Sequence, residues 1–232
     1  MNTILLLFEL IFCSPDLECY RLSDQVFWYV SYAEMKGFGR VASNGLVYTD
    51  GGQAFLFDTP VNDTLTKDLL EWIKDSLHAE VIGFVPNHWH EDCMGGLAYL
   101  QQKGIPSWAN HRTVEIAREK GLPIPDRAFD DSLTLWLNEQ PIICYFPGPA
   151  HSMDNIVVWL PNEKILFAGC LCKEMASAGL GNTADRSLPE WAATIEKVQT
   201  TFPNALIVVP GHGKPGGPEL LQHTKDLIFL YI

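Results

Sequence analysis

This sequence has little positive charge and no long apolar run. Lysine and arginine total 16 of its 232 residues against 28 acidic residues, which gives a formal net charge of −12. That sign argues against a nucleic-acid partner, because phosphate backbones are bound by basic surfaces. No stretch approaches the roughly 20 consecutive apolar residues that a membrane-spanning helix needs, so no membrane span is expected.

The chain also lacks the dense cysteine framework of a small disulfide-bonded domain. Its six cysteines are scattered and follow no regular spacing. Cys170 and Cys172 are too close in sequence for an easy mutual bridge. The sequence therefore predicts free thiols, one of which is a candidate metal ligand.

The first 19 residues differ from the rest. Residues 4–13 form an apolar stretch about as long as a signal-peptide core. No Lys or Arg precedes it, Glu9 interrupts it, and no clear small-x-small cleavage site follows. Three interpretations stay open: a leader for export to the periplasm, a truncated or wrongly assigned start, and a first strand. No linker rich in Pro, Gly or Ser interrupts residues 20–232, so they are predicted to form one domain.

Hydrophobic patterns predict an α/β protein in which strands come first and helices are mixed in later. A run rich in β-formers at 26–32 leads into "MKGFGR", where Phe38 between two glycines marks a hairpin tip. A helical repeat starts at Asp63, and the apolar strand 79–86 follows it. Further strands are predicted at 45–50, 54–60, 106–110, 133–137, 142–146, 155–160, 164–169 and around 207. Further helices are predicted at 97–104, at 112–121, after a capping box formed by Ser187 and Glu190, and from 218 to the end.

The stretch "NHWHEDCMGG" at 87–96 carries the strongest chemical signal. A surface turn does not need two imidazoles, and a packed core does not hold imidazoles and carboxylates unpaired. His88, His90 and Asp92 are instead typical zinc ligands, since zinc takes histidine nitrogen, thiolate sulfur and carboxylate oxygen, usually four in a tetrahedron. These residues alone do not complete a site, so other segments must supply ligands.

Three other segments have the same form, an apolar strand or tight turn next to one metal-type side chain. They are "PGPAHSMDN" with His151, "FAGCLCK" with Cys170, and "VVPGHGKPGG" with His212. Taken alone, a histidine in a loop is usually just a polar surface residue, and a lone cysteine is usually a small, buried apolar residue. The matched context at the ends of strands favours a shared site. His78, His111 and His223 lack this context and are interpreted as structural.

"HWHEDCMGG" resembles the HxHxD signature of the metallo-β-lactamase superfamily. "GPAHSMDNIVVWLP", "ILFAGCLCK", "GLGN" and "VVPGHG" resemble the true metallo-β-lactamases, in the subclass whose second zinc uses a cysteine. The resemblance runs from about Tyr20 to the end of the chain. It implies a four-layer αββα sandwich, with the metals in a groove at one edge of the two packed sheets.

The resemblance also implies roles for individual residues. His88, His90 and His151 would bind one zinc, and Asp92, Cys170 and His212 a second. Lys173 would bind the substrate carboxylate, Asn182 would assist at the lactam carbonyl oxygen, and Phe38 would lie at the tip of a loop that closes over the substrate. Asp92 would also orient the attacking hydroxide. Asp58 is either a buried acid behind the site or a strand-ending turn residue, and Cys93 is not counted as a ligand.

The implied activity is hydrolysis of the β-lactam amide bond of penicillins, cephalosporins and carbapenems by a metal-bound hydroxide. It would confer antibiotic resistance and need two zinc ions per chain. The expected protein is a periplasmic monomer whose partners are small-molecule substrates. One alternative is a thioester or phosphodiester hydrolase of the same superfamily, but those carry a histidine at the position of Cys93 and an aspartate at that of Cys170. A non-catalytic zinc protein is the other alternative, and it would need a closed four-ligand site.

Overall fold

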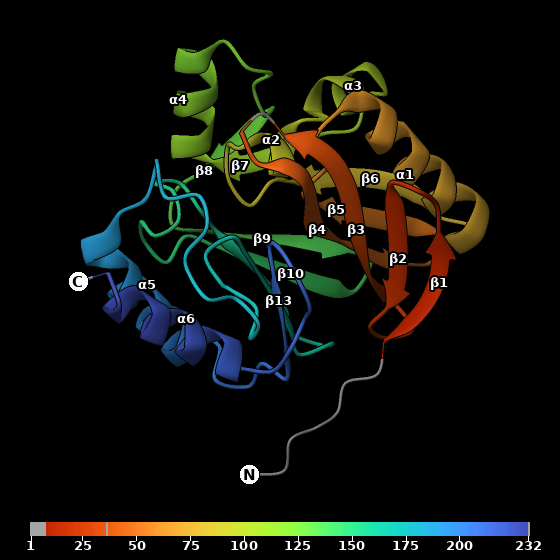
Figure 1. Ribbon diagram of the computed structural model, residues 1–232. Coiled ribbons are helices and arrows are strands. Elements are labelled where there is room, and N and C mark those ends of the chain that lie inside the picture. Colours follow the sequence, from red (N-terminus) through yellow and green to blue (C-terminus); the bar gives the residue numbers. More distant parts are fainter. Residues whose placement is uncertain (1–7, 36, 232) are drawn as a thin grey trace.

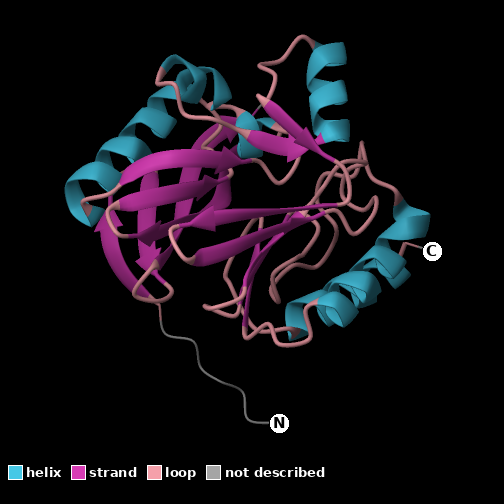
Figure 2. Ribbon diagram, turned by 180° about the vertical axis from the view of Figure 1, so that it is seen from behind, coloured by secondary structure: helices cyan, strands magenta, loops and turns pink. Residues whose placement is uncertain are grey.

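Two β-sheets pack face to face in the computed structural model, which describes residues 8–35 and 37–231 (Figures 1 and 2). The first sheet is antiparallel except for its last pair, β5 and β6, which run parallel. Its strands, in spatial order, are β1 (Glu9–Cys13), β2 (Leu17–Arg21), β3 (Val26–Met35), β4 (Gly39–Asp50), β5 (Gln53–Phe57) and β6 (Glu80–Val85).

The second sheet has the spatial order β13-β12-β11-β10-β9, and only its β12–β13 pair is parallel. A separate parallel pair, β7 with β8, lies beside the first sheet. The bounds of these strands are β7 (Trp108–Asn110), β8 (Arg127–Phe129), β9 (Ser132–Leu137), β10 (Gln140–Tyr145), β11 (Val157–Leu160), β12 (Ile165–Gly169) and β13 (Ile207–Pro210).

Helices cover the outer face of each sheet, which makes four layers (Figure 2). Helix α1 links the parallel strands β5 and β6, and α5 links β12 and β13, as parallel pairing requires a crossover. The helices are α1 (Asp63–Leu77), α2 (Glu91–Met94), α3 (Leu97–Gln102), α4 (His111–Lys120), α5 (Leu188–Thr201) and α6 (Glu219–Phe229). The predicted αββα sandwich is confirmed.

Alternation along the strands builds three apolar layers from one sequence pattern. In β3, Trp28 points into the core between the sheets, whereas its neighbour Phe27 packs toward α1. In β12, Phe167 faces the same central core and Leu166 packs against the α5 and α6 layer. Each fully buried side chain of this size contributes about 1.5–3 kcal/mol, and the central layer fixes how the two sheets face each other.

Most of the predicted elements are present, with differences at the ends. The first 19 residues contribute β1 and part of β2, so the sheet extends across the expected domain boundary at residue 20. That observation agrees with the interpretation of this segment as a first strand. The capping box at α5 is wrong in detail, because Ser187 Oγ donates to Glu190 Oε2 at 2.6 Å and makes no bond to the helix backbone. Among the described residues, none of the helices is long and apolar enough to cross a membrane.

Candidate metal centre

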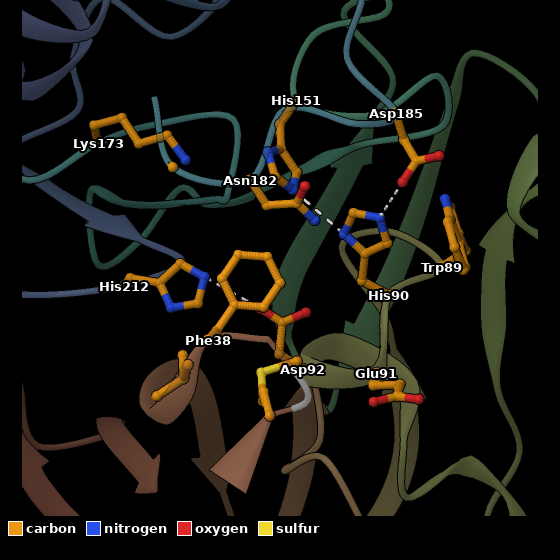
Figure 3. Close-up of a pocket in the computed structure, with 13 residues that line it drawn as sticks. Phe38, Trp89, His90, Glu91, Asp92, His151, Lys173, Asn182, Asp185 and His212 are labelled. Carbon is orange, nitrogen blue, oxygen red and sulfur yellow. Dashed lines mark hydrogen bonds and ion pairs between the residues drawn. The ribbon is translucent and has the colours of Figure 1, made fainter. Parts of the chain in front are cut away.

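Metal-type side chains gather at one edge of the sandwich, where strands of both sheets end. The turn after β6 and the short helix that follows it carry four of them, and the loops after β10, β12 and β13 carry one each. They are His88, His90, Asp92, Cys93, His151, Cys170 and His212, and all but Cys93 are ligands that the sequence predicts. The six predicted ligands come from four separate segments of the sequence, and the fold brings all four segments to one place. Figure 3 shows four of these ligands, His90, Asp92, His151 and His212.

The first ligand set is a triangle of imidazole nitrogens from His88, His90 and His151. His88 Nε2 lies 2.8 Å from His90 Nδ1, and His151 Nε2 lies 3.3 Å from the same atom. Tetrahedral zinc with bonds of about 2.0–2.1 Å requires nitrogens about 3.3 Å apart. Three imidazoles turned toward one point cannot satisfy each other by hydrogen bonds, because each neutral ring has only one proton to donate. The triangle therefore fits a zinc ion.

The second set joins three different ligand types. Cys170 Sγ lies 3.8 Å from Asp92 Oδ2 and 3.4 Å from His212 Nε2, and His212 Nε2 lies 3.2 Å from Asp92 Oδ2. Zinc–sulfur bonds of about 2.3 Å with zinc–oxygen and zinc–nitrogen bonds of about 2.0–2.2 Å give separations of about 3.3–3.6 Å. A sulfur, a carboxylate oxygen and an imidazole nitrogen at these distances also fit zinc.

The protonation preferences of the two sets differ. Burial lowers the pKa of His88 and, more strongly, that of His151, so both imidazoles are held in the neutral form that binds metal. In the second set, a hydrogen bond with Cys93 and the nearby His212 lower the pKa of the Cys170 thiol, against the effect of burial. Burial acts to raise the pKa of Asp92, but the hydrogen bond from His212 lowers it. Burial acts to lower the pKa of His212, but the Cys170 thiolate and the Asp92 carboxylate raise it well above its usual value. The second set therefore combines two anionic groups with a protonated histidine, which metal binding would deprotonate.

A layer of buried polar groups lies behind the ligands. Cys93 Sγ is 3.2 Å from His88 Nδ1, the ring nitrogen that does not face the other imidazoles. Asp58 accepts a hydrogen bond from the backbone N–H of Asn87 at 2.5 Å and is 1% exposed. Its φ of 60° also marks the end of β5. Asp58 is therefore both a strand-ending residue and a buried acid next to the turn that carries His88 and His90, as the two interpretations of the sequence proposed.

Gly211 allows the His212 loop to approach the second ligand set. A Cβ atom at this position would lie 2.3 Å from Cys170 Sγ and 2.7 Å from the Cys170 backbone nitrogen. Such contacts are too short for any larger residue. The glycine before His212 is therefore a requirement of the site and not of the turn alone.

Four of the candidate ligands, His90, Asp92, His151 and His212, line a pocket of about 500 Å³. Lys173, Asn182 and Phe38, the three residues predicted to contact substrate, all line it. Lys173 is buried, and burial lowers its pKa. Phe38 is 60% exposed, so it is not folded back onto the sheet as a core residue. Asn182 is exposed, and its Oδ1 accepts a hydrogen bond from the backbone N–H of Ala184 at 3.1 Å.

Sequence reasoning missed several pocket residues. Asp185 Oδ2 lies 3.0 Å from His90 Nε2 and so holds the ring whose other nitrogen faces the histidine triangle. Trp89 and Glu91 line the pocket next to the ligands they separate in sequence. Their positions inside "HWHEDC" were a usable signal, because neighbours of ligands lie near the site. Asp185 is three residues after Asn182 but lies in an irregular loop without a pattern.

The remaining histidines lie outside the site. His78 ends α1 with a φ of 51°, His111 Nδ1 lies 2.8 Å from Asp130 Oδ1, and His223 Nε2 lies 3.1 Å from the Ser177 carbonyl oxygen. None of the three belongs to a ligand group within the described part of the chain. Their structural interpretation agrees with these contacts.

An αββα sandwich with two metal-ligand sets open to one pocket defines a class, the metal-dependent hydrolases of this fold. A family comparison agrees with that class: residues 38–212 match the model described as "Metallo-beta-lactamase superfamily". The chain belongs to this superfamily and is a hydrolase.

Relatives share both sequence and structure with the chain. A "Metallo-beta-lactamase type 2" from Bacteroides fragilis is 48% identical, with 100% of this chain and 98% of the relative covered. One from Pseudomonas aeruginosa is 34% identical, with coverages of 97% and 93%. Among solved structures, a metallo-beta-lactamase from Pontibacter korlensis superposes with a TM-score of 0.88 at 39% identity, covering 92% of this chain and 99% of that one. The DIM-1 metallo-beta-lactamase exposed to ceftazidime superposes with a TM-score of 0.89 at 36% identity, with coverages of 94% and 99%.

Proposed function

We propose that this protein hydrolyses the amide bond of β-lactams, among them penicillins, cephalosporins and carbapenems, with two zinc ions per chain, and thereby confers resistance to these antibiotics. One observation carries the proposal: two three-residue groups of different chemistry each place two side chains in the lining of the pocket that also contains the buried Lys173. Three ligands leave a coordination position open at each ion, as catalytic sites require. A closed four-ligand structural site would have no such position.

The residues of the chain divide the work around the ions. When bound, the zinc ions supply Lewis-acid chemistry and lower the pKa of a coordinated water to about 7. His88, His90 and His151 would hold one ion, and Cys170 and His212 would hold the other together with Asp92. We assign to Asp92 a second role, orienting the attacking water through its carboxylate.

Lys173 and Asn182 handle the substrate in this proposal. The buried ammonium of Lys173 binds the carboxylate that penicillins, cephalosporins and carbapenems share, as a point charge on a flexible stem. The Asn182 side chain donates to the lactam carbonyl oxygen as negative charge develops there. Monobactams carry a sulfonate in place of that carboxylate and should be poorer substrates.

Hydrolysis of a carbapenem by purified protein tests the proposal. The β-lactam absorbance should disappear with enzyme, persist after treatment with a chelator, and disappear again when zinc is returned. Metal analysis after dialysis against micromolar zinc should approach two ions per chain. A plateau at one ion with full activity would contradict the two-ion mechanism, and activity that survives the chelator would contradict zinc hydrolysis altogether.

Two further expectations concern the protein as a whole. We propose that it acts as a monomer and in the periplasm, where a β-lactamase meets its substrates. Sedimentation of the purified protein tests the first, and cell fractionation of an expressing bacterium tests the second. A stable dimer or a wholly cytoplasmic enzyme would contradict them separately.

A further inference from the structure

The first ligand set is assembled from two segments that are far apart in sequence. His88 and His90 lie in the turn after β6, whereas His151 lies in the loop after β10. His151 Nε2 is nevertheless only 3.3 Å from His90 Nδ1. The contacts that hold this turn to this loop therefore decide how well the three imidazoles are placed for a metal ion.

Asp154 connects the two segments through one carboxylate. Its Oδ2 accepts a hydrogen bond from the backbone N–H of Trp89 at 3.0 Å, and its Oδ1 accepts one from the hydroxyl of Ser152 at 2.7 Å. Trp89 is the residue between the two histidines of the turn, and Ser152 directly follows the histidine of the loop. A shift of the carboxylate would therefore disturb both parts of the ligand set.

A third bond fixes the carboxylate itself. Thr113, in helix α4, donates its hydroxyl to Asp154 Oδ2 at 2.8 Å. Asp154, Ser152 and Thr113 are all buried. Burying a carboxylate is costly unless its oxygens accept hydrogen bonds, and both oxygens of Asp154 do so. The carboxylate is thus held on three sides by groups that packing keeps in place.

A second link between the segments lies two residues away from the first. The backbone N–H of Ile156 donates to the Asn87 carbonyl oxygen at 2.9 Å, and Asn87 Nδ2 donates to the Ile156 carbonyl oxygen. These bonds do not involve Asp154. Loss of the Asp154 carboxylate should therefore loosen the placement of the ligands without separating the two segments.

We propose that Asp154 is a positioning residue, whose hydrogen bonds hold the turn after β6 and the loop after β10 at the distance that the three imidazoles need to bind a metal ion. The inference rests on the proposed function, which requires an ion in that set. The second set should depend on Asp154 much less, because Cys170 and His212 come from other loops.

Retention of cobalt(II) by the metal-loaded protein during titration with a chelator tests the inference without relying on activity. Cobalt bound to a thiolate gives a sulfur-to-metal charge-transfer band, which follows the set that contains Cys170. In a Cys170→Ser background, the visible bands of cobalt follow the histidine set. There, Asp154→Ala should lower the chelator concentration that removes half of the cobalt by about 10–100-fold, the usual cost of losing a contact behind a metal ligand. With Cys170 present, the charge-transfer band should respond to the chelator as in the wild type.

Asp154→Asn separates the hydrogen bonds from the charge. The amide oxygen can accept from the Trp89 N–H and the Thr113 hydroxyl, and the amide nitrogen can donate to Ser152 Oγ, because a hydroxyl both donates and accepts. All three bonds survive while the negative charge is lost. Cobalt retention by the histidine set in Asp154→Asn should therefore stay within about threefold of the wild-type value.

Two milder variants form a matched pair that keeps the test usable if Asp154→Ala folds poorly. Ser152→Ala and Thr113→Val each remove one buried hydroxyl from the same carboxylate. Only Ser152 leads to a segment that carries a ligand. Ser152→Ala should lower cobalt retention by the histidine set a few-fold, whereas Thr113→Val should leave it near the wild-type value.

Several outcomes would overturn the inference. They are wild-type retention of cobalt by the histidine set in both Asp154→Ala and Ser152→Ala, an Asp154→Asn variant as impaired as Asp154→Ala, a Thr113→Val variant as impaired as Ser152→Ala, and equal weakening of both ligand sets with a fall in melting temperature. All of these leave the proposed function standing. Failure of the wild-type histidine set to bind cobalt at all would overturn the proposed function first, and this inference with it.

Discussion

The metal ligands and the β3–β4 hairpin tip line the same pocket but are built in opposite ways. Three of the candidate ligands are buried, with His88 at 0%, Cys170 at 1% and His151 at 4% exposure, and the His212 side chain is 39% exposed, but each contacts another candidate ligand or a buried polar group. At the tip, Phe38 is 60% exposed and its backbone N–H bonds only within the hairpin, to the Met35 carbonyl oxygen at 3.0 Å. The ligand region is held by packing before a substrate binds, whereas the exposed Phe38 side chain is free to contact a substrate.

This difference indicates where each kind of mutational effect should appear. A change among the buried ligands removes a group that nothing else can replace, so it should act on metal content and on kcat. A change at the exposed tip or in the exposed loops removes contacts made only with substrate, so it should act on KM and leave folding intact. Lys173 lies between these cases, since it is buried but binds substrate.

The largest effect is expected for Cys170→Ser. The serine hydroxyl does not ionise near neutral pH, so the second ligand set loses its soft anionic donor. We expect kcat to fall about 100-fold or more, as loss of a direct ligand should exceed the 10–100-fold cost of losing a supporting contact. Metal analysis should show the zinc content falling from two toward one per chain.

Cys172→Ser is the matched control. The Cys172 thiol is also buried, but it contacts Thr224 Oγ1 at 3.6 Å and packs in the layer under α5 and α6. Its replacement should lower stability modestly and leave zinc content near the wild-type value. Equal loss of zinc from both variants would mean that Cys170 is not the ligand that distinguishes the second set.

Lys173→Ala should have the next largest effect, and it should appear mainly in KM. A hydrogen bond to a charged group contributes about 1.5–3 kcal/mol, which corresponds to a rise in KM of about 10–100-fold for substrates that carry the carboxylate. Lys74→Ala, on the exposed side of α1, removes the same charge away from the pocket and should change KM little. An unchanged KM in Lys173→Ala for every carboxylate-bearing substrate would exclude the anchoring role.

The sequence could single out the six candidate ligands because each follows a simple local rule. An apolar strand, a tight turn and one metal-type side chain recur around His151, Cys170 and His212, and the HxHxD run supplies the rest. The sandwich was predictable only through the resemblance that these motifs carry. Periodicity gave the strands and helices but not which sheets they join.

Other features were not predictable, for physical reasons. Asp185 reaches His90 across 95 residues of sequence, and such a contact leaves no local pattern. The place of Glu91 in the pocket lining depends on the short helix α2, which is too brief to show a helical period. Strand β1 stayed one of three interpretations, because the apolar run at residues 4–13 has the length of a signal-peptide core as well as that of a strand.

Phe38→Ala tests the exposed tip directly. Full burial of a phenylalanine side chain contributes about 1.5–3 kcal/mol and a partial contact with substrate less, so KM should rise by up to about tenfold. Because Phe38 is exposed in the free protein, the melting temperature and zinc content should stay at the wild-type values. A fall of several degrees in melting temperature with an unaltered KM would mean that Phe38 stabilises the hairpin and does not contact substrate.

The smallest effect is expected at Asn182, and two variants separate its possible roles. Its Oδ1 already accepts a hydrogen bond from the Ala184 N–H, so only the amide N–H group is available to a substrate carbonyl oxygen. Asn182→Ala removes both functions and should lower kcat/KM a few-fold, less than Lys173→Ala, because a bound zinc ion would supply most of the charge stabilisation at the carbonyl oxygen. Asn182→Asp keeps the acceptor for Ala184 but removes the donor and places a negative charge near the developing oxyanion. It should therefore be at least as impaired as Asn182→Ala if donation matters, whereas recovery of wild-type kcat/KM in Asn182→Asp would assign Asn182 to loop structure alone.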